Sequence, residues 1–294
     1  MTGSSLARRT LGQRLRMLRV KAGVSQSAAA RALEVSPQSI GRLEEGEPTR
    51  TSSLHINALC DKYEVNDAER KVLLNLATEA RQAQKSGGHW WYAYADLAPD
   101  GVIYYFTLEE TARKFTSFQN TLLPGLLQTA DYRRAGEWTM TPGDSAEDVD
   151  RRVEMAIERQ KRMLRNELEV DVFLSEAVLH HQVGGSAVMG RQRQHLITLG
   201  ERPNVSIRVI PQSVGSHIGL HVGSFVLLDY GETSTTDLVQ TPVVFVESFT
   251  GDLYLERESE IGPYRHAVEE IDRVALDRDE SRTLIGQIAR EYNT

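Results

Sequence analysis

The chain has 294 residues, 40% of them hydrophobic and 26% charged, a composition that can bury a core and allows two or three domains. A single cysteine, Cys60, excludes an internal disulfide and favours a reducing cytoplasm. Because no apolar run approaches about 18 residues and no apolar segment follows the basic N-terminus, we expect neither a membrane span nor a secretory signal.

The net charge of −7 is distributed unevenly along the chain. Residues 1–85 contain 14 basic and 9 acidic side chains, a net charge of +5, whereas residues 86–294 contain 20 and 32, a net charge of −12. Differences of this size also arise by chance. If the asymmetry has meaning, only the N-terminal part is suited to contact phosphate groups.

Apolar spacing and capping residues predict five short helices before residue 86. Gly23 is suited to end the first helix, Ser25 to cap the second, and Ser36 to cap the third with Pro37 at its first position. The expected order is a flexible arm at 1–10, helices at about 11–22, 26–32, 36–45, 52–63 and 66–84, and a linker at 86–90.

The rest of the chain, residues 91–294, has mixed patterns that predict an α+β domain. Residues 103–135 have helical character interrupted at Pro124-Gly125, and Ser145 with Asp148 forms a capping pair at the start of an amphipathic helix. Further expected helices are 146–165, 186–201, 262–276 and 280–292, and expected strands are 170–174, 205–211, 223–228, 243–247 and 253–255. The predicted fold class is an all-α N-terminal helix-turn-helix domain, residues 11–85, followed by this α+β domain.

The most informative segment is residues 25–46, which reads as two helices packed across a short turn. Ala30 supplies the small residue that such a contact needs, and Ile40 and Leu43 supply an apolar inner face for the second helix. Its outer face then presents Gln38 and Arg42. Glutamine pairs with adenine and arginine with guanine in the major groove, so double-stranded DNA is the expected partner.

This segment resembles the Xre family of phage-repressor-like helix-turn-helix proteins over about residues 11–65. The resemblance implies a recognition helix at about 36–45 and a buried ion pair between Arg19 and Glu44. Two positions depart from the family pattern, because Glu34 stands where glycine is frequent and Ala29 where a larger apolar residue is usual. The alternative is a plain helical bundle. The candidate DNA-binding residues are Gln26, Ser36, Pro37, Gln38, Ser39, Arg42 and Arg50.

No catalytic, metal or cofactor site is expected in the acidic part. His180 and His181 are adjacent and point in different directions, which is poor spacing for a metal. The glycine-rich run 183–190 lacks the lysine and the spacing of a phosphate loop. The aromatic run Trp90, Trp91, Tyr92 and Tyr94 suits either core packing or a surface that binds a ligand or a protein partner. We therefore expect a protein that is not an enzyme.

Residues 123–135, with the run Pro124-Gly125-Leu126-Leu127-Gln128-Thr129, are also distinctive. They resemble the signature of an actinobacterial family of WhiJ-like and antitoxin-like regulators, which join an Xre-type head to a C-terminal domain. The resemblance implies that this domain receives a signal from a small companion protein or a small ligand. The alternative is an antitoxin-like protein that neutralises a companion and autoregulates. A homodimer is expected because paired half-sites require two recognition helices.

Overall fold

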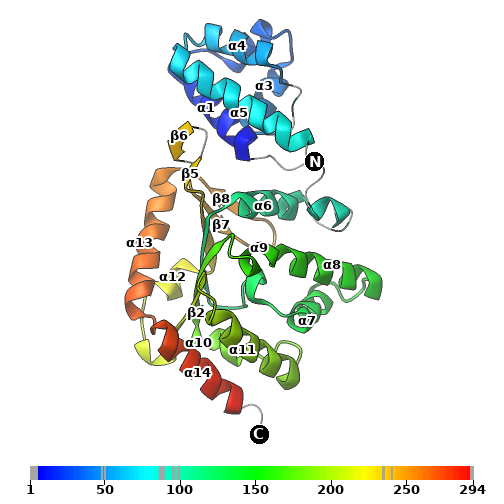
Figure 1. Cartoon of the computed structure of the whole chain (residues 1–294), viewed down its shortest axis with the longest axis vertical. Coiled ribbons are helices and arrows are strands. Elements are labelled where there is room, and N and C mark those ends of the chain that lie inside the picture. Colours follow the sequence, from blue (N-terminus) through cyan, green and yellow to red (C-terminus); the bar gives the residue numbers. More distant parts are fainter. Residues whose placement is uncertain are drawn as a thin grey trace. The chain divides into compact units, whose positions relative to one another are not determined.

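The computed structural model describes residues 6–47, 49, 51–85, 90–94, 97, 100–233, 236–239 and 241–291 (Figure 1). The chain divides into two compact units, one of Met1–Thr111 with Glu232–Gln240 and one of Ala112–Gly231 with Thr241–Thr294. The division falls between Thr111 and Ala112, and residues 86–89 of the expected linker lie outside the described residues. Among the described helices, none combines the length and the apolar character that crossing a bilayer requires.

Five helices form the N-terminal part of the first unit, as the capping residues and apolar spacing predict. They are α1 (Leu6–Lys21), α2 (Gln26–Ala32), α3 (Pro37–Glu44), α4 (Ser53–Lys62) and α5 (Asp67–Lys85). Because α1 already begins at Leu6, the second half of the arm expected at 1–10 is helical instead. The same unit continues with a 3₁₀ turn (Trp90–Tyr94), α6 (Asp100–Thr111) and a hairpin of β5 (Glu232–Thr233) and β6 (Thr236–Val239).

The five helices enclose one apolar core, and α1 runs beside α5 (Figure 1). Each helix contributes side chains that recur at helical spacing, so local amphipathicity specifies which face turns inward. The buried members include Leu11 and Leu15 from α1, Ala29 and Ala30 from α2, Ile40 and Leu43 from α3, Ile56 and Leu59 from α4, and Leu73 and Leu76 from α5.

The second unit is built on a six-stranded mixed sheet in the order β3-β2-β1-β4-β7-β8. Strands β1, β2 and β3 are parallel, and β4, β7 and β8 continue the sheet in antiparallel pairs. The strands are β1 (Lys114–Gln119), β2 (Glu169–Ser175), β3 (Val205–Ile210), β4 (Phe225–Asp229), β7 (Val243–Val246) and β8 (Leu253–Leu255). The predicted α+β class is therefore confirmed for this part of the chain.

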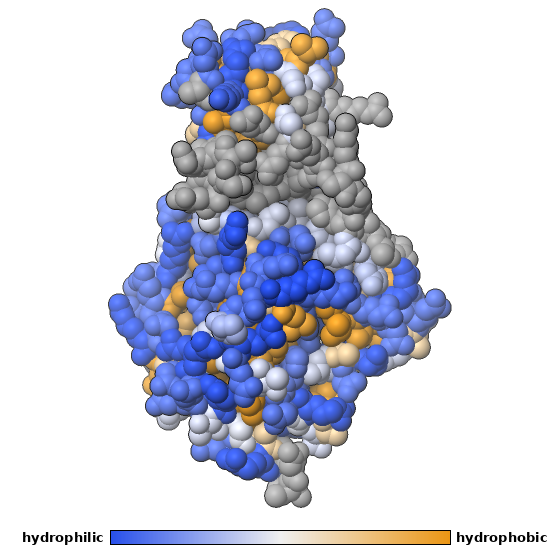
Figure 2. Space-filling model, viewed as in Figure 1, coloured by the Kyte–Doolittle hydropathy of each residue, from blue (hydrophilic) through white to orange (hydrophobic). Residues whose placement is uncertain are grey.

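Helices cover both faces of this sheet (Figure 1). α12 (Gly219–Val222) and α13 (Glu258–Val274) lie on one face, while α8 (Ala146–Arg159) and α11 (Ser186–Gly200) lie on the other (Figure 1). The remaining helical elements are α7 (Ala130–Met140), α9 (Lys161–Leu164), α10 (Glu176–His180), α14 (Arg278–Glu291) and the 3₁₀ turns Gly125–Leu127 and Gln212–Val214. In the view of Figure 2 the second unit is mostly hydrophilic, with small hydrophobic areas between the polar side chains.

The central strand β1 was expected to be part of a helical region, and that prediction is wrong. The four residues from Phe115 to Phe118 are all buried, because helices cover the sheet on both sides. A strand buried on both faces loses the alternation of polar and apolar residues that marks a half-exposed strand. The helix expected at 146–165 is also interrupted, since α8 ends at Arg159 and α9 begins at Lys161.

Candidate nucleic-acid interface

The turn between α2 and α3 is closed by backbone hydrogen bonds. The amide of Glu34 donates to Arg31 at 3.3 Å and the amide of Val35 donates to Ala30 at 3.0 Å, which places Glu34 at φ 56°. This pattern is the Schellman motif, which requires a left-handed residue directly after the helix cap. The expectation that Glu34 stands at a position better suited to glycine is confirmed.

Two serine side chains begin the paired helices. Ser25 Oγ accepts a hydrogen bond from the amide of Ala28 at 3.1 Å, and Ser36 Oγ accepts one from the amide of Ser39 at 3.2 Å. The hydroxyls of Ser36 and Ser39 are also 3.0 Å apart, and Pro37 occupies the first turn of α3. Both predicted N-caps are confirmed, and the hydroxyls of Ser36 and Ser39 therefore already hold the start of the helix.

The inner face of α3 is buried and reaches α1 at close range. Ile40 is 1% exposed and Leu43 is 6% exposed. A Cβ placed on Gly12 of α1 would lie 2.4 Å from the carbonyl oxygen of Leu43 and 2.7 Å from that of Glu44. Only a residue without a side chain permits this approach of α1 to the end of α3. Gly12 is not among the residues that the sequence pattern marked in advance.

A buried ion pair holds α1 and α3 together, as the family resemblance implies. Arg19 Nε lies 2.5 Å from Glu44 Oε1 and Arg19 Nη2 lies 2.9 Å from Glu44 Oε2, with side-chain exposures of 12% and 2%. Arg19 Nη1 also donates to the carbonyl of Val24 at 2.9 Å. The hydrogen bond to Glu44 raises the pKa of Arg19. Neither charge is presented to solvent, so the pair orients α3 instead of contacting a ligand.

Gln26 lies beside this ion pair at the first position of α2. Its Nε2 donates to Glu44 Oε2 at 3.0 Å, while the residue as a whole is exposed. The carbonyl Oε1 of Gln26 remains as the acceptor of that amide group. This candidate DNA-binding side chain is therefore oriented by a residue of α3.

The outer face of α3 brings the predicted base-reading residues together on one exposed helix surface. Pro37, Gln38 and Arg42 are all exposed, and 63% of the Arg42 side chain is accessible. Ser39 is half-buried because it faces the cap. Arg42 Nε lies 3.0 Å from Glu47 Oε2, a contact that was not predicted although Gly46 signalled the turn that produces it. The predicted contact of Arg50 lies outside the described residues.

The Pro124-Gly125 turn in the second unit is held by glutamine side chains. Gln160 Nε2 donates to the carbonyls of Gly125 at 3.0 Å and Gln128 at 2.8 Å, and Gln128 Nε2 donates to the carbonyl of Leu123 at 2.7 Å. Gln160 stands between α8 and α9, so the residue at the break between these two helices supplies the hydrogen-bond donor that holds the turn.

A third glutamine, Gln192 of α11, fastens the end of the same segment. Its Nε2 donates to the carbonyl of Leu127 at 2.7 Å, and its Oε1 accepts from the amide of Thr129 at 2.7 Å. The Tyr132 hydroxyl accepts from the amide of Leu123 at 3.2 Å. Burial raises the pKa of Tyr132. These contacts are internal to the unit, which gives the distinctive segment a structural role.

The aromatic run after residue 89 packs internally. Trp91 is 1% exposed, and the ring centroid of Trp90 lies 5.5 Å from that of Trp91 and 5.3 Å from that of Phe106 in α6. The Trp90 and Tyr94 rings are also in edge contact at 6.4 Å. Of the two readings left open for this run, core packing accounts for the described rings.

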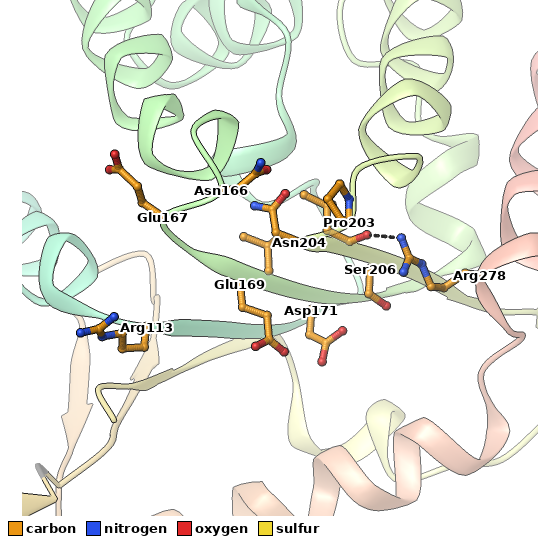
Figure 3. A pocket seen from close by; sticks show the side chains of 11 residues that line it. Arg113, Asn166, Glu167, Glu169, Asp171, Pro203, Asn204, Ser206 and Arg278 are labelled. Carbon is orange, nitrogen blue, oxygen red and sulfur yellow. Dashed lines mark hydrogen bonds between the residues drawn. The ribbon is translucent and has the colours of Figure 1, made fainter. Parts of the chain in front are cut away.

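An open trough of 670 Å³ lies at the amino ends of β2 and β3 (Figure 3). Glu169 and Asp171 point the same way from β2 (Figure 3). Lys114 Nζ lies 3.0 Å from a carboxylate oxygen of each. On the far side, Arg278 donates to the carbonyl of Val205 at 2.8 Å (Figure 3). Glu169, Asp171 and Arg278 are thus engaged in holding strands and loops together.

Comparison with protein-family models gives two matches. A model described as a domain of unknown function (DUF5753) matches residues 104–287, and a helix-turn-helix domain model matches residues 10–73. The second match covers most of α1, all of α2 to α4 and the start of α5, so the chain carries a helix-turn-helix domain at its N-terminus. Neither the curated proteins nor the solved structures give a significant match to the chain.

Proposed function

The chain belongs to the DUF5753 family, and we propose that it is a sequence-specific DNA-binding transcriptional regulator. The observation that carries the proposal is α3, whose inner face is buried while its outer face exposes Gln38 and Arg42. A helix with one packed face and one polar face fits the major groove, where an amide and a guanidinium distinguish bases. The likeness of this segment to Xre-type repressors supports the same reading.

In the proposed complex α3 lies in the major groove and α2 crosses the backbone. Gln38 pairs with adenine through its amide, and Arg42 pairs with guanine through O6 and N7. The amino ends of α2 and α3 direct backbone N–H groups towards phosphates, which sets the register of the protein on the duplex. The net charge of +5 in residues 1–85 favours this end of the chain for the contact.

We further propose that the protein binds as a homodimer and has no enzymatic activity. Two recognition helices separated by one helical turn of DNA read paired half-sites, and one chain supplies a single α3. The second unit is proposed to receive a signal from a companion protein or a small ligand. This role and the antitoxin-like alternative are tested in two steps. The full chain is first purified from the native host to identify a companion that co-purifies with it. DNA binding by the chain is then measured with and without that companion.

The proposal is tested by DNA binding of the purified full chain to a promoter fragment from its own genomic neighbourhood. Gln38→Ala and Arg42→Ala are compared with Lys71→Ala, which removes an exposed charge from α5 instead of α3. We expect each α3 variant to lose about 1–3 kcal/mol of binding free energy at one base position. Lys71→Ala should keep the base preference.

Salt dependence supplies a second measurement. The logarithm of the affinity should fall linearly with the logarithm of the salt concentration, because phosphate contacts release counterions. Base preference that is unchanged in both Gln38→Ala and Arg42→Ala would show that α3 does not read the sequence.

A further inference from the structure

The ion pair between Arg42 and Glu47 links the outer face of α3 to the segment that follows it. Arg42 Nε lies 3.0 Å from Glu47 Oε2, and the two side chains are 63% and 35% exposed. This pair differs from the one between Arg19 and Glu44, whose exposures are 12% and 2%. The first pair is on the proposed DNA-facing surface, whereas the second is inside the protein.

The backbone places Glu47 opposite Arg42. The amide of Glu47 donates to the carbonyl of Arg42 at 2.9 Å, and the amide of Gly46 donates to the carbonyl of Leu43 at 3.1 Å. Gly46 has φ 72°, the left-handed conformation that glycine adopts without strain. Together these contacts form a Schellman motif, in which the second residue beyond the helix cap returns to the last turn. The same two residues are therefore joined by main chain and by side chains.

The position of the carboxylate bears on how the guanidinium can meet a partner. The Glu47 carboxylate oxygen lies 3.0 Å from Arg42 Nε, so its negative charge opposes a second anion near that nitrogen. The guanidinium also has two terminal nitrogens, Nη1 and Nη2, whose N–H groups are further donors. Two parallel N–H donors in a fixed plane match the O6 and N7 acceptors of guanine.

The carboxylate also changes the electrostatics of Arg42. A free arginine at a DNA surface is attracted to the nearest phosphate, whatever the sequence. Glu47 neutralises that charge locally and repels phosphate, while guanine O6 and N7 remain acceptable partners for the Nη end. Glu47 thus disfavours the phosphate contact, which carries no sequence information, and leaves the guanine contact, which does carry it.

We propose that Glu47 is a specificity-determining positioning residue, which orients Arg42 towards guanine and restrains it from contacting phosphate. The inference rests on the proposed function, because it assigns a role within the same DNA-reading surface. Glu47 acts through Arg42 and need not touch the DNA itself.

The test compares Glu47→Gln, Arg42→Ala and wild type in the full chain. Glu45→Gln is the matched control, since Glu45 is an exposed acid next to the same glycine. An operator is first selected by the wild-type chain from random duplex DNA. The base read by Arg42 is the position at which Arg42→Ala loses discrimination. Each protein is then titrated with the operator, with the operator changed at that base, and with unrelated duplex DNA at several salt concentrations.

For Glu47→Gln we expect the preference for guanine at that position to fall about fivefold. This factor corresponds to the loss of an exposed ion pair whose interaction free energy lies at the upper end of the usual range. Affinity for unrelated DNA should rise, and its salt slope should steepen by about one as Arg42 becomes free to contact phosphate. Glu45→Gln should keep the guanine preference. Because the backbone bonds of the turn do not use the Glu47 side chain, circular dichroism should show unchanged helix content.

Two results would overturn the inference while leaving the proposed function intact. In the first, Arg42→Ala loses discrimination but Glu47→Gln retains it. In the second, Glu45→Gln lowers discrimination as much as Glu47→Gln, which would indicate a general charge effect. If Arg42→Ala changes discrimination at no position, both the inference and the assignment of Arg42 as a base reader are wrong.

Discussion

Replacing Arg19 with methionine should destabilise the packing of α3 against α1. The Glu44 carboxylate, 2% exposed, accepts two N–H groups from Arg19 and one from Gln26. Arg19→Met removes the positive charge and two of these three donors, leaving a buried carboxylate with one amide. Breaking a buried ion pair from one side costs about 3–5 kcal/mol. We expect that loss in the opening free energy of α3 amides, measured by native-state hydrogen exchange in the full chain.

The double variant Arg19→Met/Glu44→Leu tests whether the loss of stability comes from the unpaired Glu44 carboxylate. Replacing both charges with apolar side chains removes the unpaired carboxylate, so the opening free energy should return to within about 1 kcal/mol of wild type. The hydrogen-exchange measurement reports α3 locally and does not require the two units to unfold together. A cost below about 1 kcal/mol for Arg19→Met, or a double variant no more stable than the single one, would refute the reasoning.

Three further changes have defined outcomes. Glu34→Gly should stabilise the helix-turn-helix by about 1 kcal/mol in thermal unfolding, because Glu34 has φ 56°; an unchanged or lower melting temperature would contradict this. Gly12→Ala should destabilise it by about 1–3 kcal/mol or more and weaken DNA binding, since its Cβ would lie 2.4 Å from the Leu43 carbonyl oxygen; wild-type stability would argue against the close approach. Burial lowers the pKa of His195, so the folded chain binds fewer protons than the unfolded chain below about pH 6.5. Stability should therefore fall as pH decreases below that value, and His195→Gln should have a shallower dependence; identical profiles would exclude the role of His195.

Local signals were sufficient to predict α3. Ser36 and Pro37 mark where α3 begins, Ile40 and Leu43 mark its buried face, and Gly46 marks its end. Each signal acts within one or two helical turns, so it can be recognised from neighbouring residues alone. The same reasoning failed for β1, because a strand covered on both faces has no alternating pattern and its partners come from distant parts of the chain.

By itself, the sequence determined that the N-terminal part is a helix-turn-helix and that Gln38 and Arg42 share its outer face, since helix periodicity and capping are local properties. Only the tertiary structure decided how these groups are held. The Schellman turn brings Glu47 to Arg42, Glu44 joins Arg19 across 25 positions, and Gln192 reaches a turn more than 60 residues away. Contacts of this kind depend on folded geometry, because a polar side chain in the sequence does not indicate which distant partner it will meet.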